Sequence, residues 1–92
     1  MMIDQYRAVL VQLFKECPYG PGLHAQGWDA GIMAASIAVE LKGPGVGSNL
    51  VRRELDNQRP SRNWRRRTPE YADARRDALH TAIQRFEAIE QA

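Results

Sequence analysis

The chain has 92 residues, of which 43% are hydrophobic and 26% are charged, and its formal net charge is +2. This composition is ordinary for a small folded domain and argues against wholesale disorder. The single cysteine excludes an internal disulfide and a cysteine-based zinc cluster. No apolar run reaches the roughly 18 residues that a membrane span needs. We therefore expect one domain over residues 1–92, located in the cytoplasm and without a membrane partner.

The first helix is predicted by apolar residues that recur at steps of three and four, which is typical of an amphipathic helix. Pro18 should end it, because a proline disfavours helical geometry in the residue before it. Residues 18–27 contain two prolines and three glycines and are predicted to form a loop. The apolar stripe of this helix consists of Ile3, Tyr6, Val9, Leu10, Leu13, Phe14 and Cys17.

The second helix is expected to begin near Asp29, a good N-cap residue, with Trp28 as an apolar residue just before it. The Gly–Pro pair at 43–44 should end it, because glycine suits a helix C-cap and proline cannot continue the helix. The segment is apolar nearly all round, which is typical of a buried central helix. We therefore expect Ile37, in its middle, to be buried.

Two further helices are predicted in the second half of the chain. Ser48 is expected to cap a third helix, which carries Leu50, Val51 and Leu55. Thr68-Pro69-Glu70 combines an N-cap hydroxyl, a proline in the first turn and an acid near the positive end of a helix, and so predicts the start of a fourth. Strand patterns are nearly absent. The sequence thus predicts an all-α, four-helix domain with a basic arm between helices three and four.

Charge is segregated along the chain. Residues 52–76 hold nine of the thirteen basic residues, all of them arginine, and only four acids, which leaves +5. The rest of the chain holds four bases and seven acids, which leaves −3. A segregated basic segment indicates a surface that meets a polyanion.

A helix-turn-helix pattern overlaps the start of this segment. The segment Ile37-Ala38-Val39-Glu40-Leu41, a Gly/Pro turn and the segment Leu50 to Leu55 resemble the helix-turn-helix of small DNA-binding proteins over about residues 36–59. The turn over 43–48 is longer than is usual in that family. The resemblance implies that the second of its helices enters the major groove. Arg52 and Arg53 could then contact phosphates or guanine edges, and Asn57 could contact an adenine edge. The alternative is a plain pair of antiparallel helices with arginines on a solvated face.

The arm over residues 59–67 contains five arginines and one tryptophan. Arginine interleaved with an aromatic residue can combine phosphate contacts with base stacking. The alternative is a solvated linker whose tryptophan docks on the core. The candidate nucleic-acid-binding residues are Arg52, Arg53, Asn57, Arg59, Arg62, Trp64, Arg65, Arg66 and Arg67.

No pattern indicates catalysis, and we expect neither an enzyme nor a cofactor. Cys17, His24 and His80 lack the spacing of a metal or catalytic site. The sequence favours a small regulatory protein that binds nucleic acid, DNA in preference to RNA. The alternative is a phage-type inhibitor or adaptor, similar to an anti-CRISPR protein, that binds an acidic protein surface or a ribonucleoprotein machine. Either is compatible with a homodimer.

Overall fold

The protein was analysed as a computed structural model that describes residues 2–41, 46–56 and 68–91. Its helices are α1 (Met2–Lys15), α2 (Leu23–Leu41), α3 (Gly47–Asp56) and α4 (Pro69–Glu90), and these described ranges contain no strand. The predicted all-α, four-helix class is confirmed. The predicted basic arm over 59–67 lies outside the described residues.

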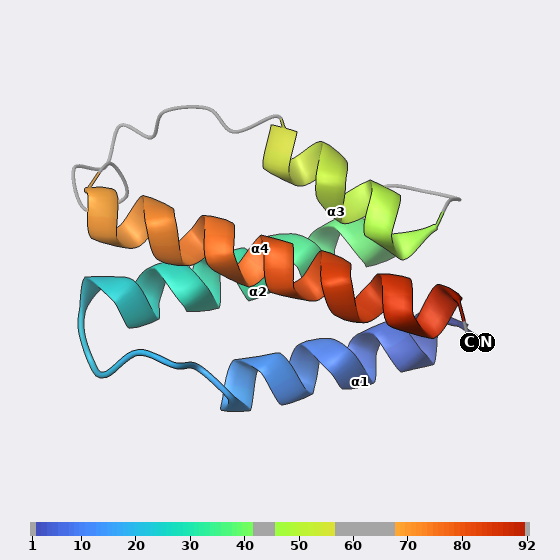
Figure 1. Ribbon diagram of the computed structural model, residues 1–92, viewed down its shortest axis with the longest axis horizontal. Helices are drawn as coiled ribbons and strands as arrows, with labels where there is room; N and C mark the ends of the chain where they lie inside the picture. The colour runs from blue at the N-terminus through green and yellow to red at the C-terminus, as the bar shows by residue number, and fades with distance from the viewer. Residues whose placement is uncertain (1, 42–45, 57–67, 92) are drawn as a thin grey trace.

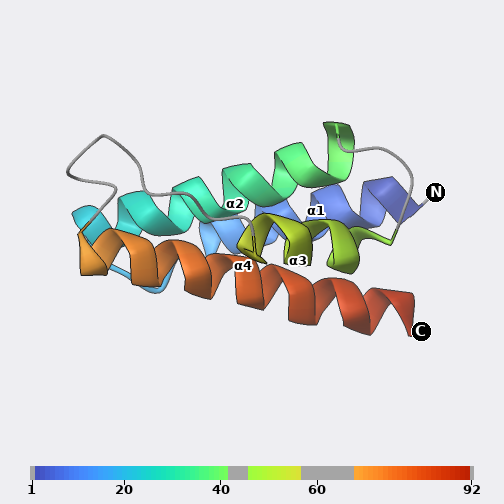
Figure 2. The ribbon, with the colours of Figure 1, turned by 90° about the horizontal axis from the view of Figure 1, so that it is seen from above.

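Helix α4 is the element on which the fold is built, because it packs against each of the other three helices. In Figure 1, α4 crosses in front of α2, with α1 on one side and α3 on the other. Figure 2 shows the same helices from above. Helices α2 and α4 run in the same direction, whereas α1 and α3 run in the opposite direction. The core lies between them and includes the fully buried Leu13, Val51, Leu79 and Phe86.

Two glycines allow α2 and α4 to approach closely. A Cβ atom on Gly27 would overlap the carbonyl oxygen of Tyr71, and one on Gly31 would lie 2.6 Å from the carbonyl oxygen of Arg75. Gly27 was expected in a loop and α2 was expected to begin near Asp29. Both predictions are wrong, since α2 begins at Leu23. The glycine at 27 serves close helix packing here, not chain reversal.

Trp28 ties α1 to α2. It was expected just before the second helix, but it lies inside α2, is buried, and donates its indole Nε1–H to the carbonyl oxygen of Leu13 at 2.9 Å. Tyr6 and Leu10 of the predicted α1 stripe are also buried, whereas Phe14 of that stripe is exposed. The predicted amphipathic face of α1 is therefore correct at its centre and too wide at one edge.

The outer side of α2 is exposed, which contradicts the prediction of a helix buried all round. Ile37 was expected in the core, but it is 45% exposed, and Met33 and Leu41 are more exposed still. Ile32 and Val39 on the inner side are buried, as expected. The physical reason is that the described partners of α2 all pack on its inner side, so no described helix covers the outer stripe.

The start of α4 follows the predicted capping pattern. The Thr68 side-chain oxygen accepts a hydrogen bond from the backbone N–H of Tyr71 at 3.4 Å, with Pro69 in the first turn. One face of the helix is buried as expected, over Tyr71, Ala74, Ala78, Leu79, Ala82, Ile83 and Phe86.

Candidate nucleic-acid interface

The positive charge of the basic segment is concentrated in its central part. Residues 52–56, at the end of α3, hold two arginines and two acids, and residues 68–76, at the start of α4, again hold two of each. Both flanks are therefore neutral. The eleven residues 57–67 hold five arginines and no acid, so the whole +5 falls there. The predicted site residues Asn57, Arg59, Arg62, Trp64, Arg65, Arg66 and Arg67 all lie in this stretch, outside the described residues.

The structure describes both ends of this stretch. On one side, α3 ends at Asp56, and on the other, Thr68 caps α4. The two helices are linked by an ion pair between Glu54, near the end of α3, and Arg75, about two turns into α4, with 3.6 Å between Nη2 and Oε1 and both side chains about a quarter exposed. The central arginine-rich stretch is thus attached to two helices that are packed on each other.

Helix α3 presents a polar face to solvent. Asn49, Arg52, Arg53 and Asp56 are exposed and follow the spacing of one helix face, while Leu50 and Val51 on the opposite side are buried. This division arises because Leu50 and Val51 pack toward α2 and α4, which both contact α3. The predicted site residues Arg52 and Arg53 therefore lie together on an accessible helix surface.

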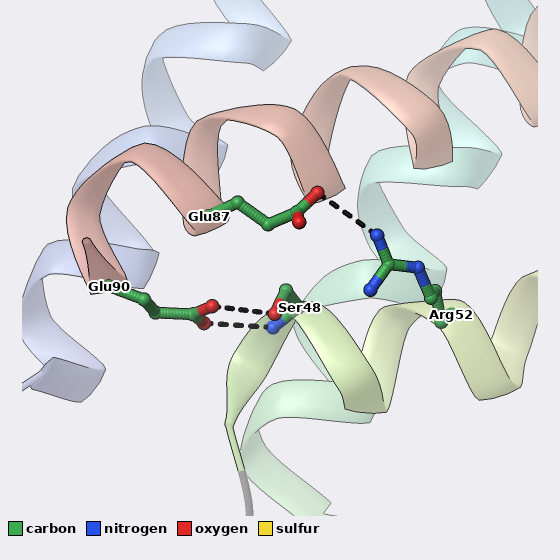
Figure 3. Close-up of polar contacts among 4 residues, drawn as sticks. All are labelled: Ser48, Arg52, Glu87 and Glu90. Carbon is green, nitrogen blue, oxygen red and sulfur yellow. Dashed lines mark hydrogen bonds and ion pairs between the residues drawn. The ribbon is translucent and has the colours of Figure 1, made fainter.

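Arg52 and Arg53 differ in their electrostatic surroundings. The Nη2 of Arg52 donates to Glu87 Oε1 at 3.0 Å, and the two side chains of this pair are 48% and 37% exposed (Figure 3). Such an exposed ion pair contributes about 0–1 kcal/mol, so a phosphate could replace Glu87 at small cost. Arg53 makes no ion pair with any described residue. Within the described residues, its guanidinium has no ion-pair partner to exchange.

Arg75 and Arg76, at the C-terminal end of the basic segment 52–76, also form ion pairs. Besides the contact of Arg75 with Glu54, Arg76 lies 3.8 Å from Asp73 one helical turn earlier. Together with Glu87, these acids lower the positive potential of the described helices near the segment. Among the described arginines of residues 52–76, Arg53 is therefore the one without an ion pair to another described residue, and Arg52 lies beside it.

The N-terminus of α3 is anchored by a carboxylate of α4. Ser48 was expected to act as the N-cap, but it is buried inside the first turn, and its Oγ donates to Glu90 Oε1 at 2.6 Å while its backbone N–H donates to Glu90 Oε2 at 3.1 Å (Figure 3). Tyr6 donates to the same Oε2 at 2.6 Å. The carboxylate of Glu90 thus performs the role that was assigned to the Ser48 hydroxyl.

This network shifts the acidities of its members. Burial acts to raise the pKa of Glu90, but the hydrogen bonds from Ser48 and Tyr6 outweigh it, and the pKa lies below the ordinary glutamate value. Burial and the neighbouring Glu90 carboxylate raise the pKa of Tyr6. The negative charge of Glu90 also suits the positive end of α3. The start of α3, the helix that carries Arg52 and Arg53, thus contacts a carboxylate whose pKa lies below the ordinary glutamate value.

Asn49, Glu87 and Glu90 contribute to this surface and were not among the predicted site residues. Asn49 could have been found from its spacing, since it lies three and four residues before the two arginines of α3. Glu87 and Glu90 carry no such local signal, because they lie 35 and 42 residues from their partners Arg52 and Ser48. Their role becomes visible only once α3 and α4 are packed together.

Cys17 and His24, which sequence analysis considered for a metal or catalytic site, make local contacts with Tyr19 instead. Cys17 donates its thiol to the carbonyl oxygen of Tyr19 at 3.7 Å, and His24 stacks on the Tyr19 ring with 5.0 Å between centroids. Across residues 2–41, 46–56 and 68–91, no three His, Cys, Asp or Glu side chains form a group that could hold a metal ion. No helix in these ranges is both long and apolar enough to cross a membrane.

Compared with known proteins, the chain matches no family model, no curated protein and no solved structure.

Proposed function

We propose that this protein is a small nucleic-acid-binding regulator that contacts phosphates through the arginines of residues 57–67 and through the exposed face of α3. The observation that carries the proposal is the placement of charge. Five arginines and no acid occur in eleven consecutive residues, and the stretch joins a helix whose exposed face carries Arg52 and Arg53. A phosphate backbone is the common cellular ligand for such a dense, acid-free set of guanidinium groups.

The two parts of the surface would have different roles. The arginines of 57–67 supply most of the positive charge, so we assign them the phosphate contacts and the salt-dependent affinity. Asn49, Arg52 and Arg53 stand on a packed helix, and a side chain in a fixed position is what a contact to a base edge requires. We therefore assign to α3 any preference for sequence, in keeping with the helix-turn-helix resemblance of residues 36–59.

Arg53 is the stronger of the two candidates on α3. Arg52 must first leave Glu87, whereas Arg53 has no ion pair to break within the described residues. Substitution of Arg53 should therefore weaken binding more than substitution of Arg52. Removal of Glu87 should increase affinity, because it frees Arg52 and removes a negative charge beside the proposed interface.

Fluorescence anisotropy with a labelled 20-base-pair duplex tests the phosphate contacts. The variant R65Q/R66Q/R67Q should lose affinity, and its slope of log K against log salt should be smaller than that of the parent by about 0.9 for each lost contact. Lys15→Gln is the control for a single charge, because Lys15 is exposed in the last turn of α1 and lies outside the proposed surface. It should leave the salt slope unchanged.

A second titration separates base contacts from phosphate contacts. If Arg53 contacts a base, Arg53→Ala should cost about 1–3 kcal/mol on a duplex enriched by selection and much less on random sequence. Equal losses on both duplexes would limit the surface to general phosphate binding. A parallel titration with single-stranded RNA tests the expected preference for DNA. Absence of binding to all of these ligands at low salt would refute the proposed function and would point to the alternative, an inhibitor or adaptor with an acidic protein partner.

A further inference from the structure

Helix α2 carries an exposed apolar stripe that the proposed function does not use. Met33, Ile37 and Leu41 are 62%, 45% and 76% exposed, and they follow one another at steps of four residues. Residues at this spacing lie one above the other on a helix, so the three side chains form a continuous line. They are hydrophobic, large and open to solvent along most of the second half of α2.

A second apolar stripe lies beside it on α1. Arg7 of α1 donates from Nε to Glu40 Oε1 of α2 at 2.7 Å, which fixes where the two helices face each other. Val11 and Phe14, which are 56% and 55% exposed, follow Arg7 by four and seven residues and share its side of α1. Ile37 and Met33 precede Glu40 by three and seven residues and share its side of α2.

Because α1 and α2 run in opposite directions, both stripes extend from this ion pair along the same edge of the molecule. They therefore form one surface, which we call the α1/α2 apolar face and which consists of Val11, Phe14, Met33, Ile37 and Leu41.

The charge of this face favours a second copy of the chain as its partner. Residues 30–39 of α2 contain no charged side chain, and the Arg7–Glu40 pair beside them is neutral as a unit. A polyanion or a strongly charged protein finds no complementary charge here. Two copies can bring their uncharged α2 stripes together without opposing like charges, and the arginines of α3 and α4 lie on other elements.

The size of the face agrees with a reversible dimer. At the exposed fractions of these five side chains, each leaves on the order of 100 Å² open to solvent, or about 500 Å² per copy. Two copies would therefore bury on the order of 1,000 Å² of surface, which is close to the smallest area of specific protein–protein interfaces. A dimer with an interface of this area should form at micromolar or higher protein concentration.

We infer that the α1/α2 apolar face is a dimerisation surface on which two copies of this chain pack against each other. Ile37 lies at the centre of the α2 stripe, so it should contact the partner copy and be sensitive to a charge. This inference does not rest on nucleic-acid binding, since the face shares no residue with the proposed phosphate-binding surface.

Sedimentation velocity across roughly 1 µM to 1 mM, the range in which an interface of this size should associate, tests the inference. The parent should shift from the 10.4 kDa of one chain toward twice that mass as concentration rises, whereas Ile37→Asp should dissociate at least tenfold more readily. Ala88→Asp is the matched control, because Ala88 is also exposed on a helix but lies on α4 outside the face. It should dimerise as the parent does.

Two results would overturn the inference. One is a parent that keeps the mass of a single chain at the highest concentration, which would leave the face for a different protein partner. The other is Ile37→Asp that dimerises as strongly as the parent, which would place the dimer contact elsewhere. If Ile37→Asp proves to be unfolded by circular dichroism, Leu41→Gln serves in its place, since Leu41 is the most exposed residue of the face.

Discussion

Replacement of Glu90 tests whether one carboxylate of α4 holds the start of α3. In Glu90→Ala, the hydroxyls of Tyr6 and Ser48 and the backbone N–H of Ser48 lose their shared acceptor. Hydrogen bonds to a charged acceptor contribute about 1.5–3 kcal/mol each, but water can reach part of this half-buried site. We therefore expect the free energy of unfolding to fall by about 2–4 kcal/mol, less than the sum of three such bonds.

Glu90→Gln separates the charge from the hydrogen bonds. An amide oxygen can accept from Tyr6 and from the Ser48 backbone, and the amide nitrogen can donate to the Ser48 hydroxyl. This variant keeps the geometry of the network and loses only its negative charge. We expect it to reduce the free energy of unfolding by about 1 kcal/mol, because neutral hydrogen bonds are weaker than charge-assisted ones.

The pH dependence of the same variants provides a second check. The pKa of Glu90 is lower in the folded protein than in the unfolded chain, so folding favours the ionised carboxylate. Its contribution is complete above the ordinary glutamate pKa of about 4.3 and is lost as the pH falls through the folded value. Urea denaturation followed by circular dichroism at several pH values should show the parent and Glu90→Gln converging in acid. A difference that stays constant down to acidic pH, or Glu90→Ala as stable as the parent at pH 7, would refute this account.

Three further changes probe the packing and capping that position these helices. Gly31→Ala should lower the melting temperature, with a loss of about 1–3 kcal/mol, because the new methyl group meets the backbone of α4. Gly20→Ala, where a Cβ meets nothing within 4 Å, is its control and should melt as the parent does. Trp28→Phe should cost about 1–3 kcal/mol in a urea titration, because it leaves the buried Leu13 carbonyl without its donor; an unchanged midpoint would mean that water replaces the indole. Thr68→Ala should cost about 1 kcal/mol and Thr68→Ser much less, since only the hydroxyl caps α4; equal losses would show that the methyl group matters instead.

The predictions from sequence were correct where local rules determine the structure. The spacing of apolar residues gave the helical class, and the Thr68-Pro69-Glu70 pattern located the start of α4. They were wrong where a residue type has two physical uses. Gly27 resembles a loop residue in the sequence, but it allows α4 to approach, and this difference depends on a helix more than forty residues away.

The exposure of Ile37 could not be predicted from local sequence rules either. A helix that is apolar on every side shows no polar stripe by which its outer face can be recognised, so the number of neighbouring helices decides which residues are exposed. In the candidate site, too, some features follow from the local sequence and others depend on packing. The charge of residues 52–76 could be predicted from the sequence, whereas the pairing of Arg52 with Glu87 and of Ser48 with Glu90 depends on how α3 packs against α4.

The position of α4 in the chain has a consequence for the order of folding. Helices α1, α2 and α3 all pack against α4, which follows them in the sequence. A nascent chain that has emerged only as far as α3 exposes the faces of α1, α2 and α3 that pack on α4 in the complete fold. Cooperative folding must therefore wait until α4 has left the ribosome. During that interval the unfinished chain presents apolar surface that chaperones or a second nascent chain could bind.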